Sequence, residues 1–167
     1  MRHLKPRLIV QVRGDSVAIV TDPHGKPPRS ALVSVAKLLV WLIEEWYARV
    51  FQDRKKALLI CDRYYHDLLV DPRRYRYGGP EWVARYVGKL MPQPDLWVLL
   101  NAPATILQTR KQEVSLEETV RQCDAYLDFI RNQKSFVIVD AAQSLENVIT
   151  DIEKAIAKKI KEDRNHG

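Results

Sequence analysis

Two charged side chains stand together where an apolar run of the chain ends. Residues 57–61 (ALLIC) have the length and composition of a buried strand, and Asp62 and Arg63 follow directly. A carboxylate at such a place could hold a magnesium ion, and a guanidinium could grip a phosphate through two parallel hydrogen bonds. The structural alternative is an ion pair between the two side chains or a helix cap, and the pair alone leaves both interpretations open.

An arginine-rich segment, residues 71–80 (DPRRYRYGGP), is the second candidate site. Arg73, Arg74 and Arg76 repel one another unless an anion neutralises them, and the two glycines would let backbone amides approach that anion. The interleaved tyrosines could stack on a base or a sugar. A solvated charged loop or a nucleic-acid patch would have the same composition, so the segment indicates an anion without identifying it.

Two further segments carry weaker signals. The basic residues Arg110 and Lys111 lie between two expected helices and Arg121 lies on the second of them, so that they could close over a phosphate donor as a lid. Asp22 opens a loop (DPHGK) that follows an expected strand, and His24 or Lys26 of this loop could meet a substrate anion. Ordinary surface charge is the simpler interpretation of both segments. No catalytic triad, zinc-ligand spacing or paired histidine motif accompanies them in the sequence.

Short strands and amphipathic helices alternate along the chain from residue 57 onward and must position these side chains. The strands are apolar on both faces, which predicts a parallel sheet covered by helices on both sides. Ligands of such sheets bind at the carboxyl ends of the strands, where Asn101 and Asp140 join the Asp62–Arg63 pair. The expected strands are 8–12, 17–21, 57–61, 96–100 and 136–139, the first two being compatible with a hairpin, and the expected helices are 30–54, 81–91, 104–112, 115–132 and 144–160.

The composition of the 167-residue chain is that of one globular domain. Hydrophobic residues make up 46% and charged residues 29%, which makes a disordered chain unlikely, and the 6 Gly, 9 Pro and 2 Cys exclude collagen-like and disulfide-scaffold classes. A net charge of +6 mildly favours an anionic partner. Two widely spaced cysteines and the lack of a signal peptide or membrane-spanning stretch predict a reduced, cytoplasmic protein without membrane contact. We expect a single domain over residues 1–167, with a polar, disordered tail at 162–167.

Three segments follow one another in an order that a known family shares. DRYY spans residues 62–65 after an apolar strand, PDLWVLLNAP spans 94–103, and LQTRK spans 107–111. This ordered set resembles the thymidylate kinase-like branch of P-loop kinases, in which an Asp-Arg-Tyr motif follows the third strand and a Pro-Asp, apolar strand, small residue and proline lead to the helix before the lid. The similarity extends from about residue 22 to residue 160, and it is closest to family members that carry a DPRRYRYGGP segment.

The resemblance implies an α/β three-layer sandwich with a mostly parallel sheet. It also implies phosphoryl transfer from ATP, with magnesium, to a nucleotide or related small acceptor that need not be thymidylate. By this analogy Arg63 would contact the phosphate of the acceptor, and Asp62 would lie near the magnesium ion. The remaining candidates would divide between the two substrates: Asp22, His24, Tyr64, Tyr65, Arg73, Arg74 and Arg76 on the acceptor side, and Arg110, Lys111 and Arg121 in the lid on the ATP side.

One departure from the family concerns the ATP site. The family begins with a strand and a glycine-rich loop, Gly-x-x-x-x-Gly-Lys-Ser/Thr, whose amides and lysine hold the ATP phosphates. The sequence contains no such motif, so we expect an N-terminally truncated form of the P-loop kinase fold whose activity is impaired or lost in this chain alone. The missing strand would be central in the sheet, and without a substitute its neighbours would lie apart with unsatisfied amides.

Three functions remain open at this point. The first is a nucleotide kinase-like phosphotransferase, the second a non-catalytic nucleotide- or anion-binding protein, and the third a binder of nucleic acid or another polyanion through the net charge of +6. A nucleotide or other phosphorylated small molecule is the expected partner under the first two, which we rank above the third. A homodimer is left open.

Overall fold

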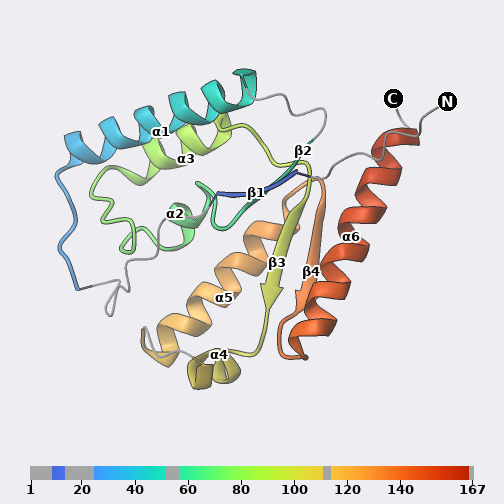
Figure 1. Cartoon of the computed structure of the whole chain (residues 1–167). Helices are drawn as coiled ribbons and strands as arrows, with labels where there is room; N and C mark the ends of the chain where they lie inside the picture. Colours follow the sequence, from blue (N-terminus) through green and yellow to red (C-terminus); the bar gives the residue numbers. More distant parts are fainter. Residues whose placement is uncertain (1–8, 14–24, 52–56, 111–113, 166–167) are drawn as a thin grey trace. The chain divides into compact units, whose positions relative to one another are not determined.

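The computed structural model describes residues 9–13, 25–51, 57–110 and 114–165. The chain divides into two compact units, Met1–Pro92 and Gln93–Gly167, which we call the N-terminal and C-terminal units. Strands and helices alternate in both, which confirms the predicted α/β class (Figure 1). The N-terminal unit holds β1 (Ile9–Arg13), α1 (Ala31–Phe51), β2 (Ala57–Cys61), α2 (Asp67–Val70) and α3 (Glu81–Leu90); the C-terminal unit holds β3 (Trp97–Asn101), α4 (Ala104–Arg110), α5 (Leu116–Arg131), β4 (Phe136–Asp140) and α6 (Leu145–Asn165).

The described strands form two parallel pairs, one in each unit. β1 pairs with β2 in a register that sets Ile9 beside Ala57, and β3 pairs with β4 in a register that sets Asn101 beside Asp140. The predicted parallel pairing is therefore confirmed for every strand pair in the described ranges. The expected strand at 17–21, and with it the hairpin, lies outside the described residues.

A small aromatic core holds the N-terminal unit together. Tyr65 is fully buried, and its hydroxyl donates a hydrogen bond of 2.7 Å to the carbonyl oxygen of Ala84 on α3. The ring of Trp41 on α1 meets the Tyr65 ring edge-on at 5.3 Å. Gly88 of α3 lies against the other part of the ring, where a β-carbon would come within 3.1 Å of Tyr65 Cε1. Tyr65 therefore joins the loop after β2 to both α1 and α3.

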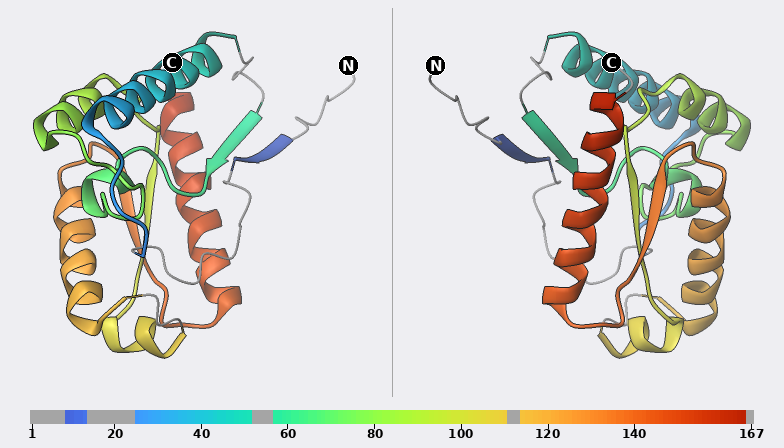
Figure 2. Two further views of the ribbon diagram at one scale, coloured as in Figure 1. Left: turned by 90° about the vertical axis from the view of Figure 1, so that its left-hand side faces the viewer. Right: turned by 90° about the vertical axis from the view of Figure 1, so that its right-hand side faces the viewer.

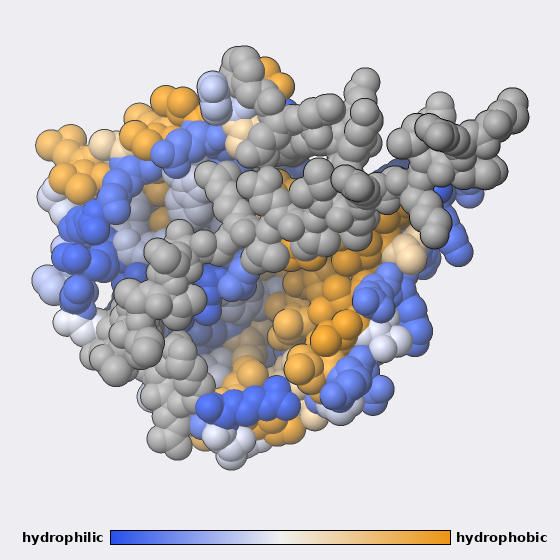
Figure 3. Space-filling view, viewed as in Figure 1, coloured by the Kyte–Doolittle hydropathy of each residue, from blue (hydrophilic) through white to orange (hydrophobic). Residues whose placement is uncertain are grey.

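Helix α1 buries its less apolar side. Its contacts with α3 come from the side that carries Leu38, Trp41 and Leu42, while the indole N–H of Trp46 donates to the carbonyl oxygen of Leu90. The opposite side is more apolar and is exposed along the length of the helix (Figure 3). Helical spacing correctly predicted the element, but a helix that is apolar all round does not reveal from spacing which face it buries.

The C-terminal unit has a helix on each side of its strand pair. Figure 2 shows α5 and α6 on the two sides of β3 and β4, and the rings of Trp97 on β3 and Phe129 on α5 meet edge-on at 5.1 Å. Ser115 caps the start of α5, because its Oγ accepts a hydrogen bond from the amide of Glu118. Helices therefore cover both faces of this parallel pair, as the apolar strand sequences predicted.

The predicted tail at the C-terminus is wrong for residues 162–165. Helix α6 continues through Asn165, and ion pairs spaced four residues apart join Lys158 to Glu162 and Lys159 to Asp163 along its last turns. Such pairs support an exposed helix without burial. The polar composition of this segment therefore indicated that its side chains are exposed, but it did not indicate where the helix ends.

We expect Tyr65→Phe to lower the free energy of unfolding by ~1 kcal/mol, because one buried hydrogen bond is lost. Tyr65→Ala should cost ~3–5 kcal/mol because it also leaves a cavity between α1 and α3. Urea unfolding followed by tryptophan fluorescence measures both, since Trp41 contacts the ring. Tyr86→Phe is the control, because Tyr86 lies on α3 and is 60% exposed. Wild-type stability of Tyr65→Ala would contradict this account of the core.

Candidate functional site

The turn after β2 presents Arg63 at the carboxyl end of a parallel strand. Asp62 and Arg63 are both exposed, and Arg63 has a φ of 62°, in the left-handed region that a side chain with a β-carbon disfavours by ~1 kcal/mol. One guanidinium nitrogen lies 3.8 Å from Oδ2 of Asp67, the first residue of α2. The partner of Arg63 is thus the carboxylate four residues on, and the arginine side chain remains 47% exposed.

The two tyrosines that follow have different surroundings. The hydroxyl of Tyr64 donates to the carbonyl oxygen of Pro92 at 2.7 Å, and its ring stacks on His66 with centroids 5.8 Å apart. Tyr65 was predicted to approach an acceptor, but its ring has no exposed surface and its hydroxyl is engaged with Ala84. Burial also raises the pKa of the Tyr65 hydroxyl. The structure therefore assigns Tyr65 to the core instead of the predicted acceptor contact.

The arginine loop, residues 71–79, is anchored to the segment that begins α1. Arg76 adopts a φ of 53°, its Nε donates to the carbonyl oxygen of Pro27 at 3.0 Å, and its own carbonyl accepts from the amide of Arg29 at 2.9 Å. The amide of Gly78 donates to Ser34 Oγ at 3.0 Å, and a β-carbon on Gly78 would collide with the carbonyl oxygen of Arg29. Of the predicted arginines, Arg76 thus has a structural role in this loop.

One turn of helix connects the Arg63 turn with the arginine loop. Helix α2 has four residues and is ~6 Å long. Asp67 at its start pairs with Arg63, and the buried Asp71 just beyond its end accepts a hydrogen bond of 3.2 Å from the amide of Arg74. Because both segments are tied to the ends of this short helix, Arg63, Arg73 and Arg74 belong to one region of the N-terminal unit. Four arginines and three aspartates occur between residues 62 and 76, so the region carries a net positive charge.

Sequence reasoning missed the two aspartates that tie this region together. Both were detectable: Asp67 is four residues after Arg63, the spacing of an ion pair along a helical turn, and Asp71 is three residues before Arg74, the spacing of a side-chain turn. The burial of His66 was also missed, because a histidine after two tyrosines carries no periodic signal of its own.

Two of the predicted lid residues, Arg110 and Arg121, lie on helices of the C-terminal unit. Arg110, the last residue of α4, donates from Nη1 to the carbonyl oxygen of Ala141 at 2.8 Å. Arg121 forms two hydrogen bonds of 2.8 and 2.6 Å with the carboxylate of Glu118 on the same helix, an ordinary surface pair. Lys111, Asp22 and His24 lie outside the described residues. No contact in the described ranges therefore distinguishes a lid from surface charge.

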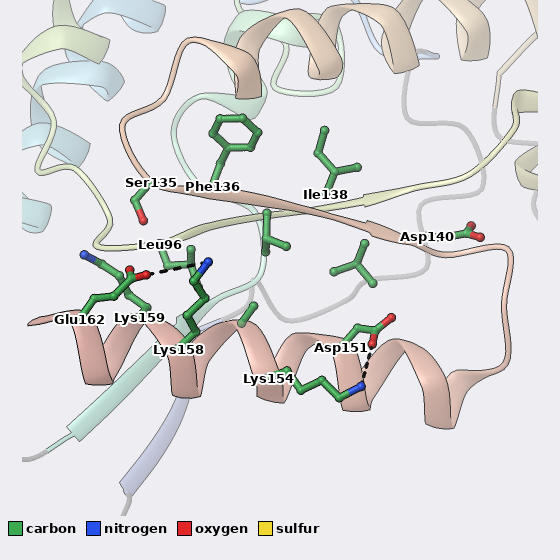
Figure 4. Close-up of a pocket in the computed structure, with 13 residues that line it drawn as sticks. Leu96, Ser135, Phe136, Ile138, Asp140, Asp151, Lys154, Lys158, Lys159 and Glu162 are labelled. Carbon is green, nitrogen blue, oxygen red and sulfur yellow. Dashed lines mark hydrogen bonds and ion pairs between the residues drawn. The ribbon is translucent and has the colours of Figure 1, made fainter.

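A groove of about 420 Å³ runs along β4 on the side of α6 (Figure 4). Of the predicted strand-end residues only Asp140 lines it, and its carboxylate accepts the amide of Ala142 at 2.8 Å in the turn that ends the strand. Lys154 and Lys158 line the groove from α6, each close to a carboxylate of its own helix. The groove thus contains locally paired charges and does not gather the predicted site.

In the described part of the chain, no three or more His, Cys, Asp or Glu side chains come together as they would around a metal ion. None of the helices in these same ranges has the length and apolar character needed to cross a membrane.

The stability of the N-terminal unit should fall as the pH drops from about 6.5 to about 4. Burial lowers the pKa of His66 to about 4 from an ordinary 6.5, while a hydrogen bond with the backbone of Gly88 opposes the shift. Between these two pH values the unfolded chain binds a proton at His66 and the folded chain does not. The free energy of unfolding therefore falls by roughly 3 kcal/mol over the whole range. Urea unfolding across this pH range should show the slope.

The variant His66→Gln should flatten this pH dependence, and His24→Gln should retain it. A slope that persists undiminished in His66→Gln would assign the effect to other groups.

A scan against protein-family models gave no match for this chain. A search of the curated proteins likewise gave no relative.

Proposed function

We propose that this chain is a nucleotide kinase-like α/β protein whose N-terminal unit binds the phosphate of a small acceptor. The observation that carries the proposal is the position of Arg63. It follows a parallel strand directly, it is held at a φ of 62°, and its guanidinium is half exposed while one carboxylate orients it. Strained backbone at a strand end persists where the surrounding structure enforces it, and it is concentrated at ligand sites.

The neighbouring arginine loop supports the same ligand class. Arg73 is exposed and Arg74 half-buried on a segment that Asp71, Ser34 and Pro27 hold in place. Guanidinium groups recognise phosphate through paired hydrogen bonds, and a fixed segment loses little entropy when it forms them. A monophosphate ester with a base or sugar fits a region that also contains the half-buried ring of Tyr75.

The resemblance of the sequence to thymidylate kinase-like proteins supplies the rest of the proposal. It adds a three-layer P-loop kinase sandwich, ATP as the donor, and magnesium, for which the exposed Asp62 would be a carboxylate ligand beside phosphate oxygens. The strands of the described ranges form two parallel pairs, which is the number that a sheet of that type would contain without its central strand. Since the sequence has no Gly-x-x-x-x-Gly-Lys-Ser/Thr loop, we propose acceptor binding as the activity of this chain alone.

The proposal predicts phosphate-dependent binding that requires the guanidinium of Arg63. Calorimetric titration with dTMP, UMP, CMP, AMP and GMP should show binding of at least one, and the matching nucleoside should bind at least ~10-fold more weakly. Arg63→Ala and Arg63→Gly should both weaken binding by roughly 10- to 100-fold, the value of a hydrogen bond to a charged group.

The two Arg63 variants separate the side chain from the backbone. Glycine relieves the strain at a φ of 62°, so a loss caused by backbone distortion would appear in Arg63→Ala and not in Arg63→Gly. Arg85→Ala is the matched control, because Arg85 is an exposed arginine of the same unit that pairs with Glu81 at 2.6 Å. Undiminished binding in both Arg63 variants would refute the assignment.

Two other outcomes would favour the alternative functions. Binding of ATP with magnesium, accompanied by transfer to the acceptor, would extend the proposal to full phosphotransferase activity. Binding of generic duplex DNA with a steep salt dependence, and of no monophosphate, would favour a polyanion binder and overturn the proposal.

A further inference from the structure

Among the described residues, strand β4 has a neighbouring strand on one side only. The amide of Trp97 donates to the carbonyl oxygen of Ser135 at 3.0 Å, and the amide of Ala141 donates to that of Asn101 at 2.7 Å. A parallel ladder that contains these two bonds uses every second residue of each strand. It leaves the N–H and C=O groups of three residues on the far side of β4, which we call the β4 edge: Phe136, Ile138 and Asp140. No described residue forms a hydrogen bond with these backbone groups.

The groove beside α6 follows the β4 edge. All five residues of β4 line this groove. Phe136 lies next to Trp97 in the register, and the Trp97 ring packs on α5, so the side chains of Phe136 and Ile138 are on the α5 side of the sheet. Figure 4 shows both side chains pointing away from α6. The groove therefore meets these two residues at their backbone.

We propose that the β4 edge binds an extended segment of a partner protein, which adds to β3 and β4 as a third strand and directs acidic side chains toward α6. A row of N–H and C=O groups along a strand is the surface to which another strand pairs. The five residues of β4 extend over about 17 Å, so a segment of similar length would pair with them. A third strand also stabilises a sheet that has only two.

The side chains of the bound segment would alternate between two surfaces. On the α5 side they would lie next to Phe136 and Ile138, which are apolar and are 41% and 40% exposed. Cross-strand neighbours of this kind favour apolar side chains. On the α6 side the groove is lined by Lys154 and Lys158, which are one helical turn apart. The site therefore fits a segment in which apolar and acidic residues alternate.

The two lysines can exchange their present partners for a carboxylate of the bound segment. Their ion pairs with Asp151 and Glu162, at 3.5 and 3.9 Å, are exposed, and such pairs contribute at most ~1 kcal/mol. The carboxylate of Asp151 also accepts a hydrogen bond from Gln143 at 2.9 Å, and that of Asp140 accepts the amide of Ala142 at 2.8 Å. Two carboxylates of the groove are thus held by uncharged donors, which leaves its ammonium groups to favour an acidic ligand.

Amide hydrogen exchange of the full chain tests whether the β4 edge is open. In the free chain the amides of Val137 and Val139 should be protected by the bonds to β3, and the three amides of the β4 edge should exchange at least ~10-fold faster. Edge amides that are protected in the free chain at every concentration would show that another part of the chain covers them. Protection that disappears on dilution would assign the edge to a second copy of the chain, and either result would overturn the proposal.

A synthetic peptide tests the chemistry of the ligand. The probe is a fluorescein-labelled peptide with blocked ends and the sequence Ser-Val-Glu-Val-Glu-Val-Ser, and fluorescence anisotropy measures its binding. It should bind saturably and slow the exchange of the edge amides at least ~10-fold. The matching peptide with lysine in place of glutamate should bind at least ~10-fold more weakly. Absence of binding by the acidic peptide, or equal binding of the two, would refute the proposed ligand.

N-methylation of the peptide separates strand pairing from other modes of binding. In an extended peptide the valine amides face one edge and the glutamate amides face the other. Methylation of the set that faces β4 should weaken binding at least ~10-fold, and methylation of the other set is the matched control. The sensitive set also reveals the orientation, because the glutamate amides face β4 in a parallel strand and the valine amides in an antiparallel one. Equal effects of the two methylations would exclude strand addition.

Variants of the chain test the two walls of the groove. Ile138→Pro removes an edge N–H that β3 does not use, so it should weaken peptide binding at least ~10-fold. Lys158→Glu should weaken it by ~3- to 10-fold, and Lys161→Glu is the control, because Lys161 is exposed on α6 outside the groove. Circular dichroism checks that each variant is folded, and the methylated peptides decide the question if Ile138→Pro is not. None of these measurements involves Arg63, so the β4 edge and the phosphate site can fail independently.

Discussion

The ring of Tyr65 must be kept from water while its hydroxyl keeps a partner, and the N-terminal unit is arranged around that requirement. Trp41 of α1 and Ala84 and Gly88 of α3 surround it, and a carbonyl oxygen of α3 accepts a hydrogen bond from its hydroxyl. Strand β2 ends only four residues earlier, at Cys61. Holding Tyr65 inside therefore forces Asp62 and Arg63 to complete a tight turn at the surface, which is where a positive φ occurs. The exposed charge of the candidate site is thus a consequence of a buried aromatic residue.

Local sequence signals predicted the bounds of the helices and strands well, but they did not show which side of helix α1 is buried. Apolar runs, proline breaks and the serine at 115 placed most strands and helices within a few residues of their bounds, because these signals depend on neighbouring residues alone. Which side of α1 is buried depends on what packs against it. Leu38 faces the core and Ile43 faces outward although both are apolar, so no period in the sequence could separate them.

The sequence predicted the charged residues of the candidate site, but it did not predict the protein groups that these residues contact. Arginines after a strand and in a glycine-containing loop indicated an anion, and the structure keeps Arg63, Arg73 and Arg74 at the surface or near it. Tyr65, which the resemblance assigned to the acceptor side, is a core residue, while Arg76 holds a loop in place. The type of a residue indicates what its side chain could bind. Whether the side chain contacts a ligand or another part of the protein depends on groups distant in sequence, such as Pro27 and Ala84.

The hydrogen bonds between the arginine loop and the start of α1 determine how this region can respond to a ligand. Three hydrogen bonds join residues 76 and 78 to Pro27, Arg29 and Ser34, and Gly78 leaves no room for an added carbon. The loop cannot move independently, because the first turn of the 21-residue helix α1 would have to move with it. An anion that binds at this loop would therefore meet a backbone that is already held in place by these hydrogen bonds.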